Sequence, residues 1–214
     1  MSKRRESGIG MLLQIMKGSP DNQVTPDHYH TRRLIQLAGM HRLHYPLLVF
    51  AREHQGAFTD EQIAKLETLC RQNAQRSLVQ LHELTRIANR LNETRTEYIC
   101  IKGQQLARVI YGREALKESV DVDIMLVHPE DLPAVHEVIS GLGYALTNPR
   151  YFESACKKKI FLKAQREVHY VNRAMRCAID LHYRPGANTY LTAGRFRGIL
   201  SQVNKTTLEG TVLP

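Results

Sequence analysis

Apolar residues in the first part of the chain recur at the spacing of a helix face. Leu34 and Leu37 follow this spacing, and the pattern predicts a helix over residues 26–38. Gly39 comes next, and a glycine just after the last apolar turn is typical of a helix end, so we expect the helix to stop there. A second short helix is predicted over residues 45–53.

The longest helical pattern of the chain follows a suitable capping residue. Thr59 or Asp60 fits the N-cap, and the pattern then continues to about residue 92. Its apolar positions lie three or four residues apart: Ile63, Leu66, Leu69, Leu78, Leu81, Leu84, Ile87 and Leu91. Such a helix is longer than is usual in globular proteins, so we expect it to form one side of a helical subdomain over residues 1–95.

The pattern changes near residue 96, where short runs of β-forming residues begin to alternate with helical segments. Strands are predicted over residues 98–101, 120–127, 144–147, 167–171 and 177–183, the last two antiparallel and joined by a turn. Helices are predicted over residues 104–111 and 129–142, a polar loop over 112–119, and helix or strand over 149–164. This predicts an α/β domain of the α+β kind over residues 96–214, with a small mixed sheet and flanking helices.

The composition is that of a globular chain that binds anions. Of its 214 residues, 43% are apolar, and 30 Lys and Arg against 21 Asp and Glu give a formal net charge of +9. This balance favours nucleotides, nucleic acid or phosphorylated polymers as partners, without choosing among them. Residues 157–176 hold seven basic residues and one acid, and fit either a track for a polyanionic acceptor or a solvated helix face.

The cysteines and the apolar runs indicate the cellular compartment of the protein. The four cysteines, Cys70, Cys100, Cys156 and Cys177, form no CxxC pair, which argues against a zinc knuckle or a disulfide framework. The longest apolar runs fall far short of about 18 residues, so we expect no membrane span. The sequence therefore predicts a cytoplasmic protein, and it leaves the oligomeric state open.

Asp121 and Asp123 are the most informative pair in the chain, because they precede an apolar run at residues 124–127. On a strand, residues two apart point to the same face, with Cα atoms about 6–7 Å apart. Two carboxylates placed in this way can share a divalent cation, and Mg²⁺ (or Mn²⁺) prefers such hard oxygen ligands. The alternative is two solvated aspartates at the start of a strand.

A third acid, Asp180, belongs to another alternating segment. If its strand lies beside that of the first two acids, three carboxylates converge, and they repel one another unless cations neutralise them. His182 shares a face with Asp180. It can orient Asp180, touch a phosphate of a bound nucleotide, or simply pack in the core.

Basic residues near these acids are candidates for binding a nucleotide. Lys102 and Gly103 lie between a predicted strand and a predicted helix, where glycine allows close approach of the backbone and the helix start favours phosphate. Lys117, and Arg113 before it, lie in the loop ahead of the acidic strand and can neutralise a triphosphate. The alternative for these side chains is a solvated loop.

Four segments, in this order, carry a resemblance to a known family: IKGQQLARVIYG, LKESVDVDIMLV, GLGY and AIDLHYRP. Over residues 98–185 the chain resembles the bacterial nucleotidyltransferase family 5 branch of the DNA polymerase beta-like superfamily. Two positions depart from that family's usual pattern: Lys117 stands where arginine is common, and Tyr183 where tryptophan is common.

The resemblance implies that Asp121, Asp123 and Asp180 are catalytic and hold the metal. It also implies that Lys102 and Gly103 form the turn on the nucleotide side. Members of the family usually continue into a C-terminal helical region, which we expect this chain to lack.

The function implied by the resemblance is transfer of an NMP from an NTP to an acceptor hydroxyl, with release of pyrophosphate. The acceptor can be a protein, an RNA, a peptide or a small molecule. Two alternatives stay open: an inactive nucleotidyltransferase-like module that binds RNA or a partner protein, and hydrolytic or phosphotransfer chemistry at the same acids.

Overall fold

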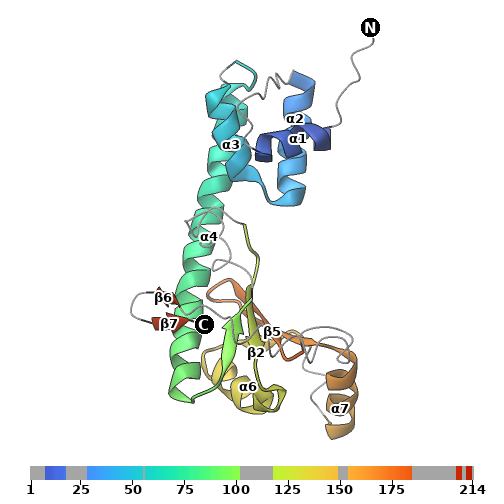
Figure 1. Cartoon of the computed structure of the whole chain (residues 1–214), viewed down its shortest axis with the longest axis vertical. Coiled ribbons are helices and arrows are strands. Elements are labelled where there is room, and N and C mark those ends of the chain that lie inside the picture. The colour runs from blue at the N-terminus through green and yellow to red at the C-terminus, as the bar shows by residue number, and fades with distance from the viewer. Residues whose placement is uncertain are drawn as a thin grey trace. The chain divides into compact units, whose positions relative to one another are not determined.

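The computed structural model describes residues 8–17, 28–54, 56–101, 118–148, 154–184, 206–208 and 211–213. The chain divides into two compact units (Figure 1). The helical unit comprises residues 1–77 and 115–118, and the sheet unit comprises residues 78–114 and 119–214. The long helix α4 (Asp60–Glu93) contributes to both units. The predicted helix over residues 104–111 lies outside the described residues.

In the helical unit, α1 (Gly8–Lys17), α2 (His28–His41) and α3 (His44–Glu53) pack on one another. Their apolar faces and the first part of α4 enclose a core that includes Leu34, Leu47 and Leu66, each fully buried. The two short helices predicted from the sequence are thus confirmed, within a few residues at their ends. No helix that the structure describes has both the length and the apolar character needed to cross a membrane.

The expected end of α2 at Gly39 was wrong, because the helix continues two residues further, to His41. The chain turns at Arg42, whose φ of 58° lies in the left-handed region. The backbone N–H of Leu43 then donates to the carbonyl of Ala38 at 2.8 Å, which closes the last turn. A non-glycine residue thus takes the conformation for which glycine was expected.

The start of α4 follows the prediction closely. The Thr59 hydroxyl oxygen accepts a hydrogen bond from the backbone N–H of Gln62 at 3.3 Å, and the Gln62 side chain accepts one from the N–H of Thr59 at 3.0 Å. This reciprocal pair is a capping box, in which Thr59 is the cap and Asp60 the first helical residue.

The sheet unit contains a five-stranded mixed sheet in the order β1-β2-β5-β4-β3. Its strands are β1 (Tyr98–Cys100), β2 (Val122–Leu126), β3 (Ala145–Leu146), β4 (Glu167–Asn172) and β5 (Cys177–His182). The pair β2 and β5 is parallel and the other pairs are antiparallel. The α+β fold class is confirmed, as is the antiparallel pair β4 and β5.

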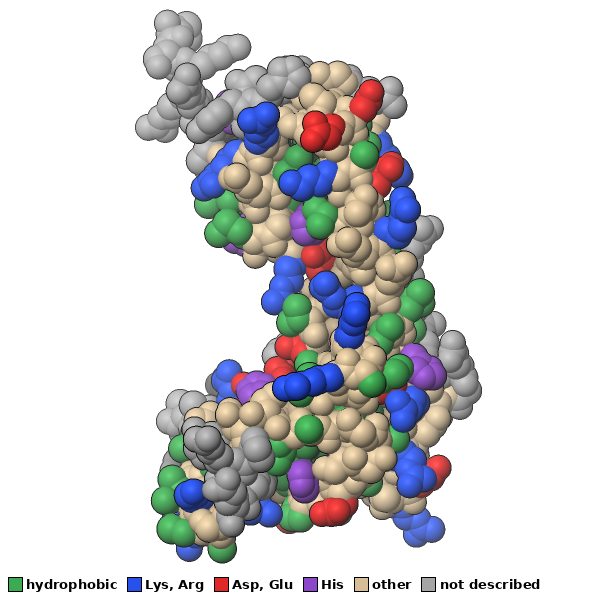
Figure 2. Space-filling view, turned by 180° about the vertical axis from the view of Figure 1, so that it is seen from behind, with side chains coloured by type: hydrophobic (Ala, Val, Ile, Leu, Met, Phe, Trp, Pro, Cys, Tyr) green, Lys and Arg blue, Asp and Glu red, His purple; other side chains and the backbone are tan. Residues whose placement is uncertain are grey.

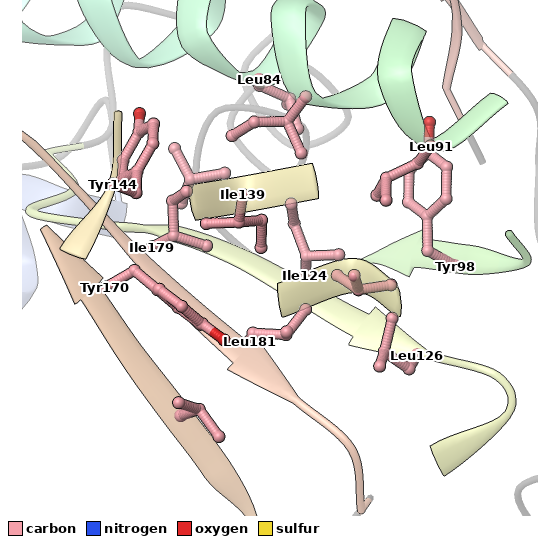
Figure 3. Packing of buried hydrophobic residues seen from close by; sticks show 14 of the residues in the cluster. Leu84, Leu91, Tyr98, Ile124, Leu126, Ile139, Tyr144, Tyr170, Ile179 and Leu181 are labelled. Atoms are coloured by element: carbon pink, nitrogen blue, oxygen red, sulfur yellow. The ribbon is translucent and has the colours of Figure 1, made fainter. Parts of the chain in front are cut away.

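Helices cover one face of this sheet and enclose its core. Fully buried Ile124 and Ile179 of the sheet contact this core, together with Leu91 of α4 and Ile139 of α6 (Leu132–Gly141) (Figure 3). A 3-10 turn, η2 (Pro129–Asp131), precedes α6, so the helix predicted over residues 129–142 is shorter and begins with a tighter turn.

Two further elements complete the sheet unit. The ambiguous segment 149–164 contains a helix, α7 (Ala155–Ala164), and the Ser154 hydroxyl oxygen accepts from the backbone N–H of Lys157 at 3.2 Å to cap it. A small hairpin of β6 (Thr206–Leu208) and β7 (Thr211–Leu213) was not predicted. The Thr211 hydroxyl donates to the Asn89 side chain of α4 at 2.9 Å.

A fully buried acid, Glu83 of α4, is held by two partners. The Tyr144 hydroxyl donates to one carboxylate oxygen at 2.7 Å, and Arg86 contacts the other oxygen at 2.7 Å. Burial of Tyr144 raises the pKa of its hydroxyl well above the ordinary value, so the hydroxyl stays protonated and can donate.

We expect Tyr144→Phe to lower the free energy of unfolding by about 1–3 kcal/mol, because it leaves a buried carboxylate oxygen without this donor. Tyr98→Phe is the matched control. Tyr98 is equally buried, at 3% exposure, but its hydroxyl lies 3.4 Å from Asn92, so a loss of about 0.5 kcal/mol is expected. Urea denaturation of both variants measures the difference, and equal losses would contradict this account of Glu83.

The cysteines differ in burial, and this difference predicts their reactivity. Burial raises the pKa of the Cys100 thiol to about 12 and that of Cys70 to about 11, while Cys156 is exposed. Because the thiolate is the reactive form, we expect one fast-reacting thiol in the native protein at pH 8, measured with a chromogenic disulfide reagent. Cys156→Ser should remove that phase, and rapid reaction of a second thiol would contradict the prediction.

Candidate functional site

Three neighbouring strands bring acids and histidines together on the face of the sheet opposite the core. Asp123 of β2 is the direct partner of Asp180 of β5. On the other side of β5, His169 of β4 is opposite Asp180, and Glu167 of β4 is opposite His182. Because partners across strands share a face and side chains alternate along a strand, all five side chains project from the same face.

Three carboxylates form a compact group at this face. Asp121, Asp123 and Asp180 each offer an oxygen, and these oxygens all lie within 4.8 Å of one another. The structure thus brings together the three acids that the sequence singled out. Their role as metal ligands stays a prediction.

The expectation that Asp121 lies on the strand was wrong, because β2 begins at Val122. Asp121 belongs to the turn before the strand, where the Ser119 hydroxyl donates to the backbone carbonyl of Asp121 at 2.9 Å. The buried Gln80 side chain donates in turn to the carbonyl of Ser119 at 3.2 Å. A polar residue of α4 therefore fixes the turn that presents Asp121.

His182 lies between two carboxylates and is almost completely buried. Its Nε2 is 3.1 Å from an oxygen of Asp123 and its Nδ1 is 2.9 Å from an oxygen of Glu167, with 7% of its side chain exposed. The contact with Asp123 has the geometry of a hydrogen bond, whereas the contact with Glu167 is an ion-pair distance. The contacts described for His182 are therefore to acids, and its role in nucleotide binding stays a prediction.

His169 and Glu167 were missed in the analysis of the sequence. His169 Nδ1 is 2.6 Å from an oxygen of Asp180, and its Nε2 is 3.7 Å from the second oxygen of Glu167. The signal was present, because the alternation of buried Val168 and Tyr170 places residues 167 and 169 on the opposite face. What was missing was the register that sets this strand beside Asp180.

The three clustered carboxylates are suitable ligands for a hard divalent cation. Its three clustered oxygens come from carboxylates, which suit Mg²⁺ or Mn²⁺ better than softer metals. The side chain of Asp123 is 5% exposed and that of Asp180 is 20% exposed, so the site is half-enclosed and open on one side. Crowded carboxylates in such a place gain from a neutralising cation.

The remaining predicted residues lie outside the part of the chain that the structure describes: Lys102, Gly103, Arg113 and Lys117. The described residue that follows them, Glu118, belongs to the helical unit. Its carboxylate accepts from the backbone N–H of His44 at 3.2 Å and contacts His44 Nδ1 at 2.6 Å.

Figure 2 shows Lys and Arg side chains of the described residues on the surface of each unit. Lys and Arg side chains are scattered there and interrupted by acidic ones. In the segment 157–176, Arg166 lies 3.6 Å from Glu167, and Arg184 nearby donates to the carbonyl of Lys163 at 3.2 Å. A track for a polyanion along this segment stays a prediction.

A comparison with known families shows to which family this chain belongs. A family model described as an uncharacterised nucleotidyltransferase matches residues 27–214. The chain belongs to this family. The matched range covers α2 to α4 and every strand that the structure describes, and so includes the three clustered acids. No curated protein and no solved structure matches the chain.

We expect Mg²⁺ to raise the melting temperature of the protein, because an ion held by the clustered acids would bind the folded chain and not the unfolded one. At a concentration about 100 times the Kd, the stabilisation is about 2.7 kcal/mol. Asp121→Asn should remove this rise and leave the metal-free melting temperature unchanged or higher, since one like charge is lost. Thermal unfolding with Mg²⁺ or with EDTA measures both effects.

Asp131→Asn is the control for this experiment. Asp131 also belongs to the sheet unit, makes no capping hydrogen bond through its side chain, and is not part of the acidic group. An equal rise with Mg²⁺ in the wild type and in Asp121→Asn would show that the ion binds elsewhere.

Proposed function

We propose that this protein transfers a nucleoside monophosphate from an NTP to an acceptor hydroxyl and releases pyrophosphate. The observation that carries the proposal is the group of three carboxylate oxygens within 4.8 Å of one another, in a chain of a nucleotidyltransferase family. Asp121, Asp123 and Asp180 would hold Mg²⁺ or Mn²⁺. When bound, the cation supplies positive charge for the phosphate oxygens and for the departing pyrophosphate.

The residues of the chain perform the remaining tasks. The acceptor oxygen forms a bond to the α-phosphorus of the NTP. At the same time, the bond between the α-phosphorus and the oxygen that links it to the β-phosphate breaks, and pyrophosphate leaves. The acid nearest the acceptor would take the hydroxyl proton. Asp180, at 20% exposure, is more open to solvent than Asp123, at 5%. Lys102, Gly103 and Lys117 are proposed to contact the triphosphate, and the acceptor is a protein, an RNA, a peptide or a small molecule.

The buried side of the site supports a fixed rather than an adaptable arrangement. Asp123 is 5% exposed and hydrogen-bonded to a buried imidazole, so its carboxylate is held in one orientation. A pre-oriented acid loses little freedom when the substrate binds, and this favours catalysis by positioning.

We expect at least one NTP to bind in the presence of Mg²⁺, and the binding to disappear in EDTA and in the double variant Asp121→Asn/Asp123→Asn. The reason is that these acids would hold the ion, whose positive charge would attract the phosphates. Calorimetry with each of the four NTPs measures this without knowledge of the acceptor. The same measurement would identify which NTP the protein binds.

Asp131→Asn serves again as the matched control and should bind the NTP like the wild type. Binding that persists in EDTA and in the double variant would favour the alternative of an inactive module. Once an acceptor is found, nucleotide labelled at the α-phosphate should leave its label on the acceptor. Label transferred from the γ-phosphate would identify phosphotransfer instead.

A further inference from the structure

Glu167 lies between the two imidazoles of the site. One of its oxygens is 2.9 Å from Nδ1 of His182, and the other is 3.7 Å from Nε2 of His169. Its side chain is only 21% exposed, so most of its surface contacts other residues of the protein. Glu167 is not one of the three acids whose oxygens cluster.

The opposite nitrogen of each imidazole reaches a different member of the acidic group. His182 Nε2 is 3.1 Å from Asp123, and His169 Nδ1 is 2.6 Å from Asp180. Glu167 is therefore linked to two of the three clustered acids, to Asp123 through His182 and to Asp180 through His169. His182 is 7% exposed, is hydrogen-bonded to Asp123 and lies within ion-pair distance of Glu167, whereas His169 is 47% exposed and lies farther from Glu167.

We propose that Glu167 is a positioning residue that, mainly through His182, fixes the carboxylate of Asp123 for metal binding. This inference rests on the proposed function, since it takes the acidic group to be the metal site. Carboxylates that bind metals are commonly held by hydrogen bonds from an outer layer of residues, and loss of such a partner typically weakens metal binding about 10–100-fold. Glu167 acts one step further out, because it orients the ring that holds the ligand.

A second account of Glu167 is that it only adds negative charge near the cation. The two accounts differ in what they require of the side chain. Positioning requires a side-chain oxygen at the distance of His182 Nδ1. Electrostatic attraction of the cation requires only the negative charge. Two conservative variants separate these needs: Glu167→Gln keeps the length and an acceptor oxygen but loses the charge, and Glu167→Asp keeps the charge but is shorter by about 1.5 Å.

The experiment is a titration of each variant with Mn²⁺ alone, followed by the electron paramagnetic resonance signal of the free ion. We expect Glu167→Asp to bind Mn²⁺ about 10-fold more weakly than the wild type. Glu167→Gln should stay within about threefold of the wild type, because it keeps an oxygen at the reach of the one that lies 2.9 Å from Nδ1 of His182. Glu137→Gln, an exposed acid of α6, is the control and should bind like the wild type.

The outcomes are separable. Weakened binding in Glu167→Gln overturns the inference, and so does wild-type binding in Glu167→Asp. Unfolding in EDTA shows whether each variant is folded. If Glu167→Asp is not, His182→Leu replaces it and is expected to weaken Mn²⁺ binding to the same extent, with wild-type binding again overturning the inference. A wild type that binds no Mn²⁺, or an Asp123→Asn variant that binds it fully, overturns the proposed function itself.

Discussion

The parallel register of β2 against β5 is the constraint on which the site depends. It sets Asp123 opposite Asp180 and, on the other face, Ile124 next to Leu181. Because side chains alternate along a strand, a shift of one residue would turn the acids into the core and the apolar residues outward. Both Ile124 and Leu181 are fully buried, so the hydrophobic core itself fixes the register. The chemistry on one face is therefore specified by packing on the other.

Bringing acids together in this way costs free energy, and the structure offsets part of it with imidazoles. Each of the two histidines lies between two carboxylates, His182 between Asp123 and Glu167, and His169 between Glu167 and Asp180. Each ring forms its described hydrogen bond with a member of the acidic group, His182 with Asp123 and His169 with Asp180. A divalent cation would supply the larger part of the neutralisation. The basic character of the whole chain, +9, helps anions to approach but does not replace this local balance.

Much of this arrangement follows from the sequence, for identifiable reasons. Alternation alone predicts β4 and β5, and the spacing of apolar residues together with Thr59 predicts α4. Local patterns fail where a contact distant in sequence decides the conformation. Asp121 leaves the strand because Ser119, held by Gln80 of α4, bonds to its carbonyl. The hairpin of β6 and β7 was missed because two strands of three residues carry too little alternation to be recognised.

The histidines and Glu167 show a different limit. Each residue was visible as a polar position on an alternating strand, but nothing local says that Glu167 is paired with His182 and His169 with Asp180. That information resides in the pairing of strands and in the turn between them. Arg176 closes this turn with a φ of 51°, a conformation that sequence patterns do not assign to arginine.

The side chains of the site differ in solvent exposure from one side of the site to the other. Among the described residues, Asp123 and His182 are 5% and 7% exposed, whereas Asp180 and His169 are 20% and 47% exposed. Asp123 therefore gains its orientation from the protein, while Asp180 keeps one side toward solvent. Under the proposed function, Asp123 would be the fixed ligand of the cation and Asp180 the more accessible acid, and positioning of this kind favours group transfer.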